Sequence, residues 1–318
     1  MNKIGFIFLF LFSAFLAGAQ LGIQFKITVA QDGTGDFETI QAAIDATKAF
    51  PPERITIVIK NGVYREKVTV PSWNNKLSII GEDRDKTIIV WDDYFKKIDR
   101  GRNSTFFTYT LKVEADDFYA ENLTIENLAG PVGQAVALHV EGNRCKFKNC
   151  KLLGNQDTAY LDGENSNQLF ENCSIAGTTD FIFGSATVVF KGCTLVSRSN
   201  SYITAASTTN DKPFGFVFLN CRLVAEKGVD NVYLGRPWRP YAKTVFINCF
   251  MDKHICNDGW KEWSNKEDKT TTFYAEYNSS GPGANTNRVE WAHQLPAKKV
   301  SEYTIKKILG EWTTTINE

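Results

Sequence analysis

The chain has 318 residues, of which 43% are hydrophobic and 23% charged, and its 36 basic side chains balance 36 acidic ones. This composition is typical of an ordinary soluble globular protein and excludes a polyelectrolyte, so neither nucleic acid nor an anionic membrane is implied as a partner. With three histidines and no CxxC pair or Cys/His cluster, the sequence predicts no zinc site, and nothing in it indicates another metal or a cofactor.

The N-terminus has the three parts of a secretory signal peptide. Lys3 supplies a charged start, an apolar run follows from Ile4 to Ala17, and the run ends in small residues. It is shorter than the roughly 20 residues that a membrane span needs, although a membrane anchor is the alternative. We therefore expect residues 1–19 to be removed. Residues 20–318 are expected to form a single domain that is secreted or periplasmic, monomeric and free of membrane contact.

The first elements after this segment are a strand and a helix. Ile27–Ala30 is predicted as the strand. Apolar residues at helical spacing, beginning at Ile40, predict an amphipathic helix over Phe37–Ala49, and Pro51 ends it. Further strands are expected at residues 55–60, 63–70, 77–80 and 87–90.

From Phe147 onward the sequence repeats the pattern Phe-x-x-Cys-x-apolar. The repeated cysteines lie 23, 20, 28 and 28 residues apart, at Cys150, Cys173, Cys193, Cys221 and Cys249. A period in the twenties, in which each unit is a short strand ending in turn residues, is typical of a solenoid. We therefore predict an all-β parallel β-helix with one coil per unit. The repeated cysteines would be small buried hydrophobic residues rather than disulfide partners.

A solenoid needs cover at its open ends. We expect the helix at Phe37–Ala49 to cover the first coil. Past Asp252 the periodicity lapses, and a tail helix near Lys299–Leu309 is expected to close the other end.

Two aspartates occupy the same place in successive units. Asp157 follows Cys150 by seven residues, and Asp180 follows Cys173 by seven. Neighbouring coils of a parallel sheet are about 4.8 Å apart, so the two carboxylates should stack on one face. Carboxylates this close share a proton, which supplies an acid and a nucleophile from one residue type. The alternative is a pair of exposed turn carboxylates.

Three other residues could complete such a site. Gln134 lies 23 residues before Asp157 and would stack on it if the coil length holds. Arg236 stands between Gly and Pro and could grip a carboxylate with two hydrogen bonds. Trp238 offers a flat apolar platform of the kind on which sugars stack. Alternatively, the glutamine is a surface residue and the Arg-Pro-Trp segment is a loop packed on the core.

Five segments in the same order resemble the pectin methylesterases, the carbohydrate esterases that remove methyl groups from methyl-esterified polygalacturonate. The resemblance covers nearly all of the chain after residue 19. The segments are Gly62–Glu66, the strand of Gln134, Gln156–Thr158, Asp180–Gly184 and Leu234–Trp238.

The resemblance implies a right-handed parallel β-helix and hydrolysis of galacturonate methyl esters in pectin, with no cofactor. Asp180 would be the nucleophile, and Asp157 would protonate departing methanol and then act as the base for the hydrolytic water. Arg236 would hold Asp180 ionised. The resemblance also implies two amides that steady the oxyanion, Gln134 and Gln156, and aromatic residues that line the sugar groove, Trp238, Phe183 and Tyr160.

Two rival functions remain open. A polygalacturonase or pectate lyase would use the same fold, but the His-Gly and Arg-Ile-Lys motifs of polygalacturonases are absent. A non-catalytic carbohydrate-binding β-helix would explain the solenoid and its aromatic residues, but it leaves the aspartate pair and Arg236 without a purpose. No Gly-x-Ser-x-Gly segment supplies the nucleophile of a serine esterase.

Overall fold

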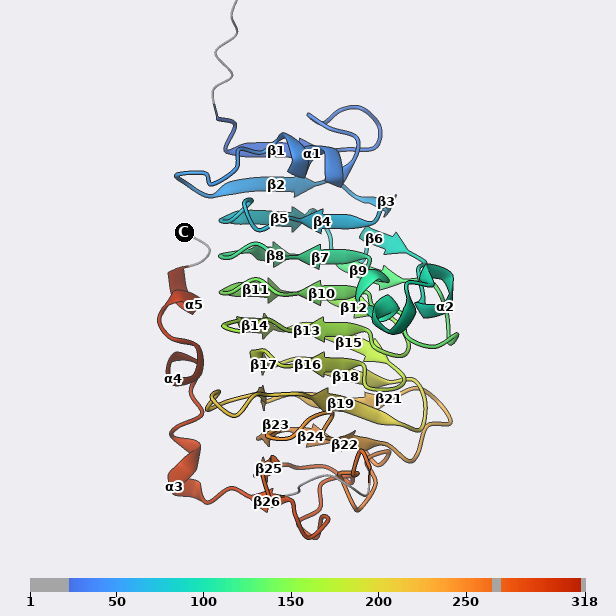
Figure 1. Cartoon of the computed structure of the whole chain (residues 1–318), viewed down its shortest axis with the longest axis vertical. Helices are drawn as coiled ribbons and strands as arrows, with labels where there is room; N and C mark the ends of the chain where they lie inside the picture. The colour runs from blue at the N-terminus through green and yellow to red at the C-terminus, as the bar shows by residue number, and fades with distance from the viewer. Residues whose placement is uncertain (1–22, 265–269, 316–318) are drawn as a thin grey trace, which may run out of the picture.

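The strands wind into three parallel sheets around one axis, which confirms the predicted parallel β-helix (Figure 1). The computed structural model describes residues 23–264 and 270–315. The predicted signal peptide, residues 1–19, lies outside the described residues. Among the described residues, no helix has the length and apolar character needed to cross a membrane.

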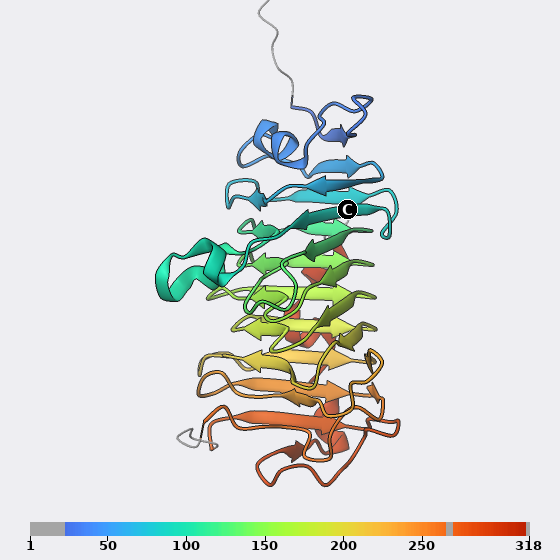
Figure 2. The same cartoon turned by 90° about the vertical axis from the view of Figure 1, so that its right-hand side faces the viewer.

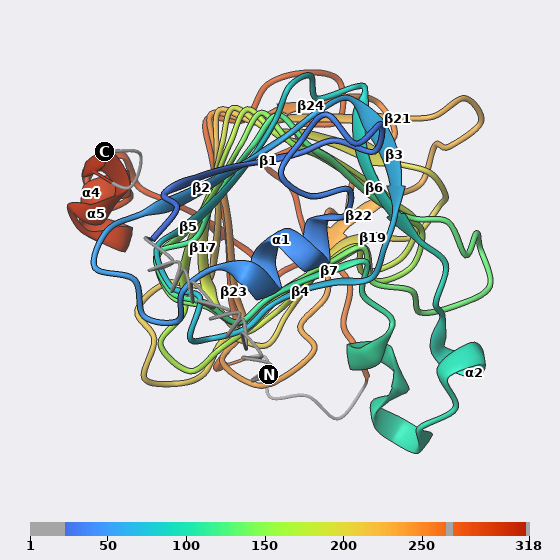
Figure 3. The same cartoon turned by 90° about the horizontal axis from the view of Figure 1, so that it is seen from above.

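Successive coils supply the strands of each sheet in turn (Figure 3). Sheet A contains β1 Lys26–Val29, β2 Ile55–Ile59, β5 Leu77–Gly81, β8 Tyr119–Glu121, β11 Cys145–Lys148, β14 Asn167–Glu171, β17 Thr187–Lys191, β20 Phe216–Leu219, β23 Lys243–Ile247, β25 Phe273–Tyr277 and β26 His293–Gln294. Sheet B contains β3 Gly62–Arg65, β6 Thr87–Trp91, β9 Thr124–Asn127, β12 Lys151–Leu153, β15 Ser174–Gly177, β18 Thr194–Ser197, β21 Arg222–Ala225 and β24 Phe250–Met251. Sheet C contains β4 Val68–Val70, β7 Leu111–Val113, β10 Leu138–Val140, β13 Ala159–Leu161, β16 Ile182–Gly184, β19 Tyr202–Ala206 and β22 Tyr233–Gly235.

The repeated phenylalanines form one stack inside the β-helix. Ring centroids from Phe147 through Phe170, Phe190 and Phe218 to Phe246 lie 4.7, 5.2, 4.5 and 4.3 Å apart. The five repeated cysteines are buried and free, as predicted, and each thiol points at a backbone carbonyl of the preceding coil. The repeat therefore records which side chains must fill the same place in every coil.

The residue before the repeated cysteine makes the turn from sheet A to sheet B. Asn149, for example, has a φ of +50°, in the left-handed region that asparagine tolerates better than most residues. Its side chain donates to Asn122 Oδ1 of the preceding coil at 2.7 Å. The same conformation recurs in later coils, which explains why this position of the repeat is nearly always asparagine.

A short helix, α1 (Ile40–Ala46), covers the first coil, as predicted. It is shorter than the expected range of 37–49, because Phe37 pairs with Val29 as a β-bridge and Thr39 is the N-cap. The carboxylate of Glu66 accepts hydrogen bonds from the first two backbone N–H groups of the helix at 2.9 and 3.0 Å. These bonds link α1 to the end of β3 in sheet B.

The prediction that a C-terminal helix closes the far end of the β-helix is wrong. The short C-terminal helices α3 (Ala297–Val300), α4 (Ile305–Leu309) and α5 (Trp312–Thr315) run back along the outside of sheet A (Figures 1 and 3). The physical reason is an apolar strip on the outer face of that sheet. The α4 residues Ile308 and Leu309 form a cluster with three residues of this strip, Leu169, Val189 and Val217.

One long connection interrupts the regular coils between β6 and β7. It contains α2 (Phe95–Ile98) and the 3-10 helix η1 (Gly101–Phe107), and it projects from the side of the β-helix (Figure 2). Phe106 of η1 packs over Tyr160 of sheet C, with ring centroids 4.8 Å apart. The connection thus forms one wall beside the outer face of sheet C.

Candidate active site

Asp157 and Asp180 occupy equivalent positions at the start of adjacent strands in sheet C, as predicted. Ala159 of β13 pairs with Ile182 of β16, so the two aspartates, each two residues earlier, are in register. Both have positive φ, +66° and +49°, which turns the chain sharply before the strand begins. They are only 6% and 4% exposed, which rules out the alternative of open turn carboxylates.

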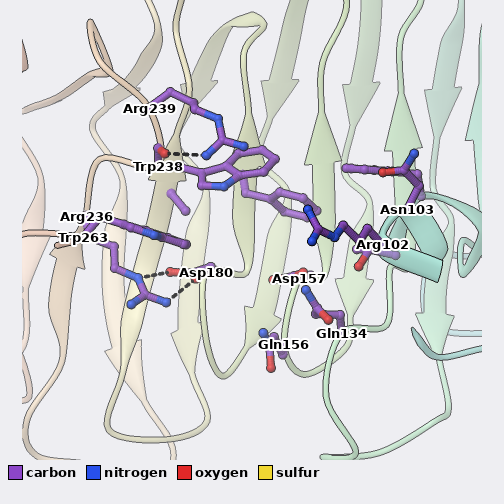
Figure 4. A pocket seen from close by; sticks show the side chains of 14 residues that line it. Arg102, Asn103, Gln134, Gln156, Asp157, Asp180, Arg236, Trp238, Arg239 and Trp263 are labelled. Atoms are coloured by element: carbon purple, nitrogen blue, oxygen red, sulfur yellow. Dashed lines mark hydrogen bonds and ion pairs between the residues drawn. The ribbon is translucent and has the colours of Figure 1, made fainter. Parts of the chain in front are cut away.

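The two glutamines pair with each other on adjacent coils, and Gln156 directly precedes Asp157. Gln134 forms a β-bridge with Gln156, not with Asp157. The predicted stacking of Gln134 on Asp157 is therefore wrong by one residue, because this coil does not keep the assumed spacing of 23. Both amide side chains nevertheless lie beside Asp157 and face the same cavity (Figure 4).

Arg236 holds Asp180 with two hydrogen bonds. Nε donates to Oδ1 at 3.0 Å and Nη2 to Oδ2 at 2.7 Å, the side-on geometry that guanidinium and carboxylate groups favour. The guanidinium lies between two aromatic rings, 4.1 Å from the centroid of Tyr202 and 4.0 Å from that of Trp263. These contacts fix the plane in which Arg236 presents its donors.

The surroundings of the two carboxyl groups give them different charges. Burial raises the pKa of Asp157 well above its usual range, and the neighbouring Asp180 raises it further. Burial also raises the pKa of Asp180, but the hydrogen bonds and charge of Arg236 oppose that rise. Because only Asp180 is paired with a cation, the shared proton resides on Asp157 and Asp180 is the carboxylate.

A cavity of about 500 Å³ opens above the aspartate pair. It is lined by seven of the eight residues predicted for the site, namely Gln134, Gln156, Asp157, Asp180, Phe183, Arg236 and Trp238. Tyr160 is the exception. Its ring lies next to Phe183 but beneath Phe106, and its hydroxyl donates to Asp162 at 2.5 Å. The prediction that Tyr160 lines the groove does not match this position, because the η1 connection covers it.

The cavity has further lining residues that the sequence analysis did not predict. They are Arg102, Asn103, Thr105, Phe106, Ala205, Arg239 and Trp263. Four of them lie on η1, outside the repeat, where no register indicates which side chain faces the site. The only available signal was the interruption itself, a long non-repeating run between two coils.

No cluster of three or more His, Cys, Asp or Glu side chains suited to a metal ion occurs in the described part of the chain. The acidic pair at the cavity floor instead has an arginine partner. The arrangement can provide an anionic oxygen nucleophile, a protonated carboxyl group and two amide donors within one cavity.

The fold and this site define a class of β-helical proteins that carry paired aspartates in a lateral groove. The model of the family described as Pectinesterase matches residues 26–311. The chain belongs to the pectinesterase family.

Relatives and solved structures agree with this assignment. Pectinesterase 31 of Arabidopsis thaliana is 37% identical over 278 residues, covering 85% of this chain and 87% of the relative. Pectinesterase 5 of the same plant is 38% identical over 309 residues, covering 92% of this chain but 51% of that protein, so the chain spans about half of some relatives. The carrot pectin methylesterase superposes with a TM-score of 0.86 and 32% identity, covering 92% of this chain and 96% of that chain. The pectin methylesterase PemA of Erwinia chrysanthemi has a TM-score of 0.78 and 32% identity, covering 90% and 97%.

Proposed function

We propose that the protein hydrolyses methyl esters of galacturonate units in pectin, releasing methanol and de-esterified pectate. The observation that carries the proposal is the pair of buried aspartates at the floor of an open cavity, one of them held by two hydrogen bonds from Arg236. Membership of the pectinesterase family supports this substrate. So does the similar pectin methylesterase solved in complex with a hexasaccharide, with a TM-score of 0.78 and 32% identity.

The first half of the reaction forms an acyl-enzyme. The Asp180 carboxylate attacks the ester carbonyl and forms a tetrahedral intermediate, whose oxyanion accepts hydrogen bonds from Gln134 and Gln156. As this intermediate collapses, Asp157 gives its proton to the departing methoxyl oxygen. Methanol leaves, and the uronate acyl group remains bonded to Asp180 as a mixed anhydride.

The second half restores the enzyme. Asp157, now ionised, removes a proton from water, and the resulting hydroxide attacks the acyl carbon. The bond to Asp180 breaks, which returns its carboxylate to Arg236 and releases the uronic acid product. Asp157 again carries the proton, so the cycle needs no external acid, base or cofactor.

Aromatic side chains place the sugar. Phe183 contacts Trp238 edge to face, with ring centroids 5.9 Å apart, and both line the cavity. The apolar faces of galacturonate rings pack on such surfaces, while the ester group points toward the aspartates. The cavity is open rather than enclosed within the coils, so it can admit a polymer chain.

The test is methanol release from highly methylated pectin by purified wild type, Asp180→Ala and a control, Asp211→Ala, which removes an exposed carboxylate elsewhere. Solution viscosity and unsaturated products are followed in parallel. We expect methanol from wild type and control only, with steady viscosity and no unsaturated product. Substantial methanol from Asp180→Ala would contradict the nucleophile. A fall in viscosity or unsaturated product would indicate a polygalacturonase or a lyase, and an inactive wild type on several pectins would favour a binding module.

We also propose that the protein acts as a secreted or periplasmic monomer comprising residues 20–318. The charged, apolar and small-residue parts of residues 1–19 support export. N-terminal sequencing of the exported protein should begin at residue 20, and light scattering should give the mass of one chain. Retention of residues 1–19 or a dimer mass would contradict the respective part.

A further inference from the structure

The residue before Asp180 belongs to the same row as one of the amides of the site. The pairing of β13 with β16 puts Gln156 and Thr179 in register on adjacent coils. Gln156 lines the cavity, and the hydroxyl of Thr179 shares a hydrogen bond of 2.8 Å with the hydroxyl of Ser201 on the following coil. A position that supplies an amide on one coil therefore supplies a link between coils on the next.

The backbone around Thr179 connects the two aspartates. The N–H of Asp157 donates to the carbonyl of Thr179 at 3.0 Å, and the N–H of Asp180 donates to the carbonyl of Tyr202 at 2.8 Å. The peptide group between Thr179 and Asp180 is thus bonded to the coil of Asp157 on one side and to the coil of Tyr202 on the other. A rotation of this peptide group would move the two aspartates relative to each other.

Asp180 has a backbone conformation that its surroundings must maintain. Its φ is +49°, in the left-handed region that few residues adopt without support. The bond between Thr179 and Ser201 attaches the chain to the following coil one residue before this turn. That coil also carries Tyr202, whose ring lies 4.1 Å from the guanidinium of Arg236. The same coil therefore supports both Asp180 and its cationic partner.

The two hydroxyl-bearing residues, Thr179 and Ser201, are half-buried. Water can replace a hydrogen bond between half-buried groups, so this bond contributes modestly to the free energy of unfolding. Its effect on position is larger. Asp180 lies between Asp157 and Arg236 (Figure 4), and Arg236 holds it through bonds of 3.0 and 2.7 Å. Because a misplacement of about 1 Å can slow a reaction strongly, even a small displacement of Asp180 should lower the rate.

We propose that Thr179 and Ser201 are positioning residues for the reaction. Their shared hydrogen bond holds Asp180 in place for attack on the ester. The inference rests on the proposed function and adds two residues to its machinery. The described lining of the cavity includes neither of them, so both act through Asp180. Loss of the bond should therefore lower kcat and leave KM nearly unchanged, since the surfaces that bind the sugar are not altered.

The experiment measures methanol release from highly methylated pectin over a range of substrate concentrations. Thr179→Val keeps the shape of the side chain and removes the hydroxyl, so kcat should fall about three- to tenfold, with KM within about twofold of wild type. Ser201→Ala removes the other end of the bond and should lose as much. Thr179→Ser keeps a hydroxyl and should retain kcat to within about twofold of wild type.

A double variant and a control distinguish the bond from general packing. Thr179→Val/Ser201→Ala should lose no more than either single variant, because both changes remove the same interaction. Thr194→Val makes the matched change at a half-buried threonine of sheet B and should have the kcat of wild type. All variants should melt within about 2 °C of wild type. An unchanged kcat in Thr179→Val, an equal loss in Thr179→Ser, losses that multiply in the double variant, or a loss confined to KM would overturn the proposal.

Failure of the proposed function would be seen separately. If wild type released no methanol from several pectins, that function would fail, and hydrogen exchange followed by mass spectrometry would still test the positioning role. The amides of residues 177–182 should exchange about threefold faster or more in Thr179→Val than in wild type, while the amides around Thr194 exchange equally in both. Equal exchange of residues 177–182 would overturn the role of the two hydroxyls.

Discussion

The inside of the β-helix and the outer face of sheet C use the same coils under opposite constraints. Inside, successive coils place the same residue at the same height, as in the stack from Phe147 to Phe246. Outside, the site takes different side chains from different coils: Gln156 and Asp157 come from one, Asp180 from the next, and Arg236 from a later one. Repetition fills a core, whereas chemistry needs unlike groups side by side.

The difference separates stability from activity. A residue of the interior stack contributes burial and ring packing, and its loss leaves a cavity that the neighbouring coils cannot fill. A residue of the site is buried at a cost, since both aspartates are desolvated. Substitutions in the two regions should therefore affect different measurements, and four substitutions test this separation.

The largest effect is expected at Asp157. Asp157→Asn keeps the size and neutrality of the protonated carboxyl group but cannot transfer its proton, so kcat should fall about 10²–10⁴-fold. Thermal stability should not decrease, because the amide replaces a buried carboxyl group that is already neutral in the folded protein. Steady-state methanol release and the melting temperature measure the two quantities. Near-normal kcat would exclude Asp157 as the proton donor, and a large loss of stability would break the separation.

The opposite result is expected in the interior stack. Phe218 lies 4.5 Å from Phe190 and 4.3 Å from Phe246, ring to ring, and is fully buried. Phe218→Ala should lower the free energy of unfolding by about 3–5 kcal/mol, with kcat unchanged at temperatures where the protein remains folded. Urea denaturation checks the first and methanol release the second. Phe50→Ala, at a ring that is 71% exposed, is the control and should change stability by about 0.5 kcal/mol or less.

The same contrast explains which features could be predicted from the sequence. The Phe-x-x-Cys repeat indicates the coils because stacking demands like residues, and the equal offset of Asp157 and Asp180 from their cysteines places the pair in register. The predicted position of Gln134 is wrong by one residue, since coil length varies where loops leave the sheets. Arg102 lies on an interruption with no repeat, and its approach to the site depends on the packing of η1 on sheet C. That packing is a tertiary contact, so no periodic pattern in the sequence predicts it.

A smaller effect is expected at Tyr202, a half-buried residue that supports Arg236. It lies on β19 next to the site, covers one face of the Arg236 guanidinium and stacks on Tyr233, with ring centroids 5.4 Å apart. Tyr202→Leu removes a cation–π contact worth about 1 kcal/mol, so kcat/KM should fall about fivefold. Because a looser Arg236 stabilises the Asp180 carboxylate less, the pKa of Asp180 should rise and the acid limb of the pH profile should move to higher pH.

Two controls separate this role from simple packing. Tyr202→Phe keeps the ring face and should retain both the rate and the pH profile of wild type. Tyr233→Leu lies one ring further from Arg236 and should change the profile less than Tyr202→Leu. An acid limb that stays in place in Tyr202→Leu would show that the ring only fills space.

The smallest effect is expected at His254, which follows β24, and concerns the pH dependence of stability. His254 is 1% exposed, and neither ring nitrogen has a hydrogen-bond partner in the described part of the chain. Burial lowers its pKa below the ordinary value of 6.5, so below pH 6.5 the unfolded chain binds the proton more readily than the folded one. The contribution of His254 to the free energy of unfolding should therefore be fully present above pH 6.5 and decrease as the pH falls, by at most about 1.4 kcal/mol per pH unit.

Urea denaturation at pH 8 and pH 5 tests this expectation. His254→Leu should lose less of its free energy of unfolding between the two pH values than wild type does. His293→Leu, at an exposed histidine, should lose as much as wild type. Equal losses in all three would mean that His254 is protonated within the fold, and the buried interior would then include a charged group after all.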